Sequence, residues 1–159
     1  MGAKGEAFAK QFEARAQEAT AVLEELSDAD WRKVTDAEKW SVGVTAHHVA
    51  GSHEPIANII KAVVAGQSRG NFTMDILHEL NAKHAKEHAN CTKAETIELH
   101  KKGAAAAAAV VRGLSDDQLA KSGTVLTGAP PMSAEQVVTG ILINHIDDHF
   151  GSIRKTVGR

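Results

Sequence analysis

Two histidines stand four residues apart in the most apolar helix that the sequence predicts, which runs from about Ser133 to Val157. At about 100° per residue, His145 and His149 lie only about 40° apart and share one helix face. An imidazole costs roughly 1 to 3 kcal/mol to bury unless its nitrogens are satisfied. This spacing also lets one helix offer two nitrogen ligands to one metal ion. The pair therefore indicates either a metal site or two core histidines bonded to backbone or water. The same stripe carries Val138, Ile141, Leu142 and Ile153.

A third histidine lies at a matching depth in another predicted helix, 41–66. On a helical wheel, His48 lies at the edge of the apolar stripe, whereas His47 points nearly opposite the centre of that stripe. His48 is seven residues past the start of its helix, and the C-terminal pair lies eight and twelve residues before the end of theirs. If the two helices are antiparallel, a rise of 1.5 Å per residue places all three within roughly 10 to 18 Å of one bundle end. We therefore predict that His48, His145 and His149 meet.

Three neutral imidazoles suit Zn, Ni, Cu or Fe(II), and three protein ligands leave coordination positions open. At an open position, a water could be activated or a thiolate could bind. A fourth protein ligand would instead close the site and favour a structural role. Two classes of function remain at this point: a metal-dependent enzyme, and a non-catalytic metal-binding or stress-response module.

Other histidines compete for these roles. His100 shares an apolar face in the helix predicted from Thr92 to about Gly113, and reaches the depth of His48 if those two helices are parallel. We predict it as a candidate catalytic base behind the ligands or as an extra ligand; the alternative is a core-edge histidine with a water or carboxylate partner. His84 and His88 form another four-residue pair, but charged residues surround them. We expect this pair to line the mouth of the site rather than to bind a metal.

The elements that must position these residues are all helical. The chain has 159 residues with 3 prolines, no tyrosine and 4% aromatics, and it is rich in good helix formers. Capping residues mark helix starts at Ser41, at Thr92 with Glu95, and at Ser133 with Gln136. The predicted fold is all-α, one domain over 1–159, a four-helix bundle with a long, partly helical crossover between helices 2 and 3. The predicted helices are about 6–26, 41–66, 92–113 and 133–157, with 71–90 helical in the crossover.

Charge and composition limit the classes of binding partner that we expect. The net charge is −2 with both signs interspersed, which favours neither a nucleic-acid footprint nor a polybasic membrane patch. No apolar run approaches membrane-spanning length and no signal peptide is evident, so we expect no membrane partner. The single cysteine, Cys91, suits a reducing, cytoplasmic location. A small-molecule substrate is expected, and a homodimer is left open because an exposed apolar helix face would favour one.

Two segments together carry a family resemblance. The stretch from Trp40 to Ala50 begins Trp-Ser and places a histidine eight residues after the tryptophan; the stretch from Asn144 to Arg154 contains His-x3-His-x-Gly-x-Ile. In this order and at these places, they resemble the DinB/YfiT-like superfamily over nearly all of the chain. The resemblance implies an up-down-down-up four-helix bundle that holds a divalent transition metal, expected to be Zn or Ni, through His48, His145 and His149.

The resemblance also bears on the reaction. Family members with known activity are similar to transferases that use a low-molecular-weight thiol, such as the mycothiol-dependent maleylpyruvate isomerases and the bacillithiol transferases. It therefore implies a thiol S-transferase that uses a low-molecular-weight thiol, with a metal-dependent hydrolase as the alternative enzyme.

Overall fold

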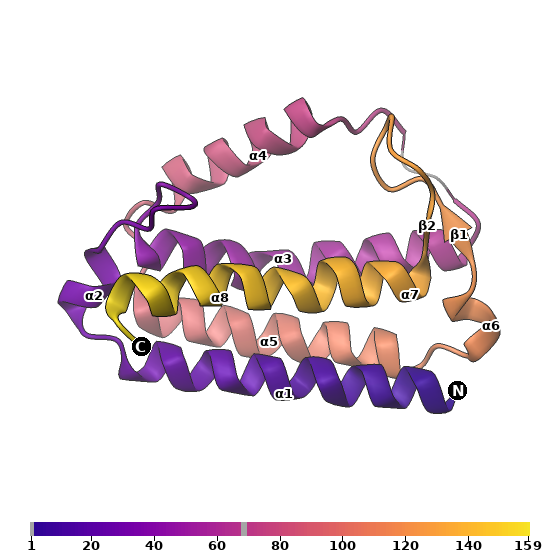
Figure 1. Ribbon diagram of the computed structural model, residues 1–159, viewed down its shortest axis with the longest axis horizontal. Coiled ribbons are helices and arrows are strands. Elements are labelled where there is room, and N and C mark those ends of the chain that lie inside the picture. Colours follow the sequence, from indigo (N-terminus) through magenta and orange to yellow (C-terminus); the bar gives the residue numbers. More distant parts are fainter. Residues whose placement is uncertain (1, 68–69) are drawn as a thin grey trace.

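Four long helices form a bundle in the computed structural model, which describes residues 2–67 and 70–159 (Figure 1). They are α1 (Ala3–Glu25), α3 (Val42–Val64), α5 (Lys93–Arg112) and a composite C-terminal helix. α1 and the C-terminal helix run in one direction, and α3 and α5 run in the other. The bundle is thus up-down-down-up, with parallel α3 and α5, which confirms the predicted fold class.

Short elements connect the long helices. α2 (Asp28–Arg32) follows α1, and α6 (Asp116–Leu119) follows α5. Strands β1 (Ser122–Gly123) and β2 (Met132–Ser133) pair antiparallel, with Ser122 opposite Ser133. Two residues per strand are too few to produce an alternating sequence pattern, so this ladder was not predictable from periodicity.

The predicted helix caps are present. The Ser41 hydroxyl accepts a hydrogen bond from the Val44 amide at 3.0 Å and starts α3. Thr92 and Glu95 form a reciprocal capping box at the start of α5. Such caps satisfy amide groups that the helix itself leaves unbonded, and so they set where each helix begins. Ser133 and Gln136 form another capping box, which starts the C-terminal helix.

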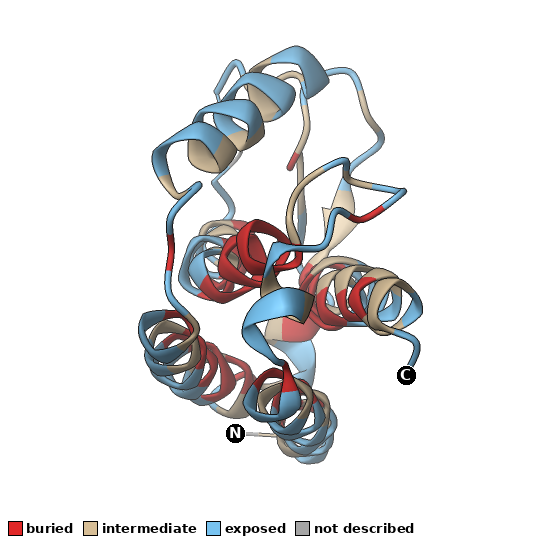
Figure 2. Ribbon diagram, turned by 90° about the vertical axis from the view of Figure 1, so that its left-hand side faces the viewer, coloured by how far each residue is buried: buried red, intermediate tan, exposed pale blue. Residues whose placement is uncertain are grey.

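The buried faces of the four helices point to a common core (Figure 2). α3 and α5 approach each other closely at Gly103. A Cβ at this position would lie 3.2 Å from the Ala50 carbonyl oxygen. Ala107 and Ala108 are almost fully buried in the same region of α5. Small side chains are needed at this approach, as the alanine run predicts. The largest fully buried side chains include Phe12, Leu23, Ile60, Leu142 and Phe150.

The periodicity predicts one regular α-helix at the C-terminus, but this helix is irregular. It consists of α7 (Ala134–Val137), a π-helical segment η1 (Val138–Ile143) and α8 (Asn144–Val157). A π segment takes more residues per turn, so a projection at 100° per residue drifts when it is carried through η1. In α8 the buried residues are Ile146, Phe150 and Ile153, and the two histidines lie at the edge of this face.

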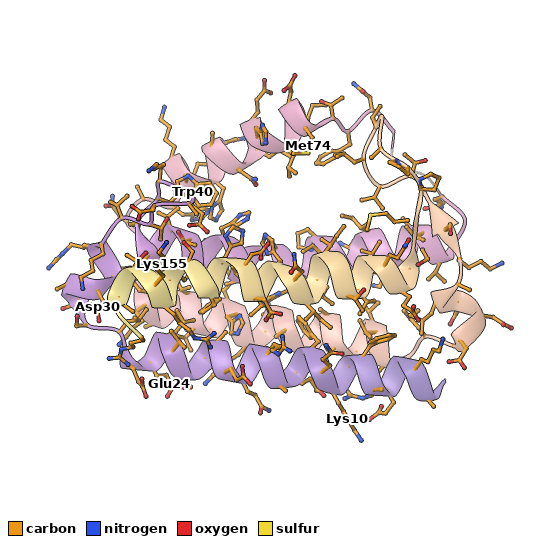
Figure 3. All side chains as sticks on the ribbon, in the orientation of Figure 1. Lys10, Glu24, Asp30, Trp40, Met74 and Lys155 are labelled. Carbon is orange, nitrogen blue, oxygen red and sulfur yellow. The ribbon has the colours of Figure 1, made fainter. Side chains whose placement is uncertain are left out.

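The crossover from α3 to α5 contains α4 (Met74–Glu87), within the predicted helical stretch 71–90. α4 lies outside the bundle, on the side of α3, and none of its 14 described residues is buried (Figures 1 and 2). Met74, at its N-terminal end, is 46% exposed. Figure 3 labels Met74 there, and labels Trp40 near the end of the bundle toward which α4 runs. Among the described helices, none is long and apolar enough to cross a membrane.

Candidate metal centre

α3 and α8 bring the three predicted histidines together. His48, His145 and His149 each offer one ring nitrogen, and these three nitrogens lie within 4.8 Å of one another. The His48 Nε2 and His145 Nε2 atoms are 3.0 Å apart. Two ligands about 2.05 Å from a tetrahedral ion are separated by roughly 3.3 Å. The observed spacing is therefore close to what one small divalent ion requires, and the donor set fits such an ion.

A carboxylate orients the third imidazole. Glu38 Oε2 lies 2.7 Å from His149 Nδ1, and the Ser152 hydroxyl donates to Glu38 Oε1 at 2.7 Å. With a proton on Nδ1 directed to the carboxylate, the Nε2 lone pair of His149 is free to bind a metal. Burial acts to raise the pKa of Glu38, but hydrogen bonds from Ser152, His149 and Thr35 outweigh it and lower that pKa. Glu38 is therefore a charged acceptor at neutral pH.

The loop between α2 and α3 places Glu38. The Thr35 amide donates to the Trp40 carbonyl at 2.8 Å, and the Lys39 amide donates to the Thr35 carbonyl at 3.1 Å. Lys39 has φ 63°, a left-handed conformation that is uncommon outside glycine. This tight turn directs Glu38 toward α8. Sequence reasoning missed Glu38, and its only signal was an acid two residues before Trp40.

His48 and His145 are neutral imidazoles. Burial, with smaller contributions from His145 and His149, lowers the pKa of His48 to about 3. Burial, then His149 and His53, lowers the pKa of His145 to about 3. A neutral imidazole is the form that binds metals. The indole of Trp40 contacts the His48 ring edge-on, with centroids 5.2 Å apart, and so limits solvent on that side.

His100 is not among the residues that converge on this group. Its Nε2 lies 2.9 Å from the Ala16 carbonyl oxygen, and its Nδ1 lies 3.0 Å from His53 Nε2. Because a carbonyl only accepts, the His100 proton is on Nε2, and Nδ1 accepts a hydrogen bond from His53. His100 is thus a buried histidine bonded to a second histidine and to α1, rather than to a carboxylate. His53 Nδ1 has no hydrogen-bond partner among the described residues.

The α4 pair lies beside the centre. His84 and His88 face His47 of α3, and the His84 ring centroid is 5.7 Å from that of His48. His84, in the crossover between α3 and α5, therefore lies next to the three-histidine group.

Comparison with known proteins defines the family. A family model of the DinB superfamily matches residues 11–153, which is most of the chain. This chain therefore belongs to the DinB superfamily, as its two sequence segments predicted. No curated protein matches it.

Solved structures share the fold. The crystal structure of a mycothiol-dependent maleylpyruvate isomerase superposes with a TM-score of 0.74 at 12% identity, over 94% of this chain and 60% of the isomerase. A mutant of that isomerase gives 0.75 at 13%. YfiT from Bacillus subtilis, described as a probable metal-dependent hydrolase with an unusual four-helix bundle topology, gives 0.69 at 17%, over 98% of this chain and 86% of YfiT. The chain spans about 60% of the isomerase.

Proposed function

We propose that this chain is a metal-dependent enzyme in which His48, His145 and His149 hold one divalent transition-metal ion, zinc or nickel. The observation that carries the proposal is the convergence of three ring nitrogens within 4.8 Å. The neutral state of His48 and His145 and the carboxylate behind His149 support it. A bound ion would supply a Lewis acid with open positions, where a thiol loses its proton or a water is activated.

Thiol S-transfer is the reaction that we propose. A low-molecular-weight thiol would be one substrate and a small electrophile the other. The support is a group of three histidines, two of which have strongly lowered pKa values, and a bundle fold shared with a protein described as mycothiol-dependent. The buried, free thiol of Cys91 is compatible with a reducing cytoplasm, in which such a thiol stays reduced.

Hydrolysis is the second candidate. It is favoured by YfiT, described as a probable metal-dependent hydrolase, because YfiT and this chain match over most of both lengths. The two reactions differ in one requirement, since a hydrolase needs no added thiol. A non-catalytic metal module would need a fourth protein ligand, and His84 beside His48 is the residue to test for that role.

His100 enters this proposal as a positioning residue. It holds His53 through their 3.0 Å contact, and His53 is close enough to His145 to contribute to the lowered pKa of that ligand. A change at His100 should therefore alter metal affinity modestly, without removing a group that touches substrate.

Metal content and thiol dependence test the proposal together. Chelator-treated wild type and His48→Ala are reloaded with Zn²⁺ or Ni²⁺, and bound metal is counted. We expect His48→Ala to bind one equivalent fewer, and His78→Ala, which removes an exposed histidine of α4, to bind as the wild type does. An equal count in His48→Ala and wild type would overturn the ligand assignment.

The loaded wild type is then assayed with an electrophile and mycothiol, bacillithiol or glutathione, and separately with ester substrates. Turnover that requires both metal and thiol supports S-transfer. Metal-dependent ester cleavage without thiol supports the hydrolase instead. Full metal loading without turnover in either assay would favour the non-catalytic module.

A further inference from the structure

A second group of three histidines lies next to the first. His47 of α3, His84 of α4 and His88, which caps the C-terminus of α4, each offer a ring nitrogen, and these nitrogens lie within 4.8 Å of one another. His47 Nδ1 is 2.8 Å from His84 Nε2. The rings of His47 and His88 stack, with centroids 4.1 Å apart and planes inclined by 22°. The spacing between ligand atoms is thus as short as in the first group.

The two groups are separate because neighbouring residues of a helix point about 100° apart. His48 faces α8, and His47 faces α4. His84 and His88, which caps the C-terminus of α4, are four residues apart, and both rings contact His47 of α3. His47 is only 9% exposed, although its wheel position is away from the apolar stripe of α3. The rings of His84 and His88 cover part of His47.

The contact between His47 and His84 leaves one nitrogen of His84 unsatisfied. Between His47 Nδ1 and His84 Nε2 only one proton can be shared, because two neutral imidazoles make one hydrogen bond there. His84 Nδ1 is buried and has no hydrogen-bond partner among the described residues. Burial, then His47 and His88, lowers the pKa of His84 to about 4. Three imidazoles whose ring nitrogens lie this close to one another are a ligand set for a transition metal.

α4 buries little apolar surface against the rest of the bundle. Its 14 described residues include none that is buried, and Leu80 is 50% exposed. The histidines lie in its C-terminal part, which runs toward the end of the bundle that carries the first centre (Figure 1). Metal ligation between α3 and α4 would supply the attachment that apolar burial supplies elsewhere in the bundle.

We propose that His47, His84 and His88 form a second metal site, which takes an imidazole-preferring divalent ion such as Zn²⁺ or Ni²⁺ and fastens the C-terminal part of α4 to α3. The ion would sit beside the first centre, because the His84 ring is 5.7 Å from the His48 ring. Occupancy of the second site would thus set how firmly α4 covers that side of the first centre.

Metal stoichiometry of four full-length proteins tests this proposal. They are the wild type, His84→Gln with His88→Gln, His145→Gln with His149→Gln, and all four substitutions together. Each is chelator-treated, confirmed as helical by circular dichroism, and titrated with Zn²⁺ and with Ni²⁺ at micromolar concentration. We expect two, one, one and no equivalents, respectively. The single variant His88→Gln serves as a milder change and should also lose one equivalent.

His78→Gln is the matched control, since it removes an exposed histidine of the same helix and should leave two equivalents. One equivalent in both the wild type and the α4 double variant would overturn the second site, as would two in the α4 double variant. Loss confined to the α4 variants would overturn the first centre and leave the second standing.

Hydrogen exchange provides an independent readout. Amides of residues 74–87 should exchange more slowly in the metal-loaded wild type than in the metal-free protein, and this difference should vanish in the α4 double variant. Slowing that persists in the double variant would show that the metal acts on α4 through another site, and would contradict the proposed attachment.

Discussion

Glu38 Oε2 lies 2.7 Å from His149 Nδ1, although 111 residues separate them in the chain. The carboxylate comes from the turn before α3, and the imidazole comes from α8. A carboxylate behind a ligand histidine fixes the ring orientation and makes its other nitrogen a better donor to a metal. This contact gives the three-histidine group a support that two helices alone do not provide.

Removing this support should weaken metal binding at the first centre without unfolding the bundle. We expect Glu38→Ala to lower the Zn²⁺ affinity roughly 10- to 100-fold, and Glu38→Gln to lower it less, because an amide oxygen still accepts from His149 Nδ1. The measurement is competition with a chromophoric chelator, in a background carrying His84→Gln and His88→Gln. Ser152→Ala is the milder comparison, since it removes one bond to Glu38 and keeps the carboxylate. An unchanged affinity in Glu38→Ala would contradict the assigned role.

Acid should destabilise the metal-free protein, and His53 should contribute a definable part. Burial, then the neighbouring His100, lowers the pKa of His53 from 6.5 to about 3. Between these values the unfolded chain binds a proton at His53 and the folded chain does not. The free energy of unfolding therefore falls as pH decreases from about 6.5 toward 3, by about 1.4 kcal/mol per pH unit for this one group.

Urea unfolding of the chelator-treated protein at several pH values measures this dependence. His53→Gln should be less stable at pH 7 but should show a shallower slope, by about one proton, between pH 6 and pH 4. Equal slopes in wild type and His53→Gln would mean that His53 takes up its proton in the folded state.

The sequence was informative where helical geometry alone places a residue. His48 and the α8 pair were found because periodicity and the distance from a helix end fix both direction and depth. Glu38 lies in a turn with no period, and its position depends on the left-handed backbone of Lys39. The contact between His53 and His100 is not predictable from the sequence for a related reason. It depends on how closely α3 and α5 pack, which helical periodicity does not determine.

The close approach of α3 and α5 makes the alanine run sensitive to position. Ala107 is fully buried and Ala106 is exposed, one residue away in the same helix. We expect Ala107→Leu to lower the free energy of unfolding by about 1 to 3 kcal/mol, because the core has no room for the added carbons. Ala106→Leu should change it by less than about 0.5 kcal/mol. Chemical denaturation of both variants checks the difference, and similar losses in the two would contradict the close packing.

Two glycines of α3 should respond to alanine in opposite directions. A Cβ at Gly43 would lie 2.4 Å from the Trp31 Nε1 atom, whereas a Cβ at Gly51 would lie 3.9 Å from Leu99 Cδ2, which is an ordinary van der Waals distance. Trp31 is held in place because its Nε1 donates to the Cys91 carbonyl at 3.0 Å. Gly43→Ala should therefore destabilise the protein by about 1 to 3 kcal/mol through overpacking. Gly51→Ala should stabilise it by about 0.5 to 1 kcal/mol, since alanine loses less backbone freedom in a helix. Thermal unfolding of the metal-free variants distinguishes the two signs, and a stable Gly43→Ala would show that Trp31 moves aside without losing its bond to the Cys91 carbonyl.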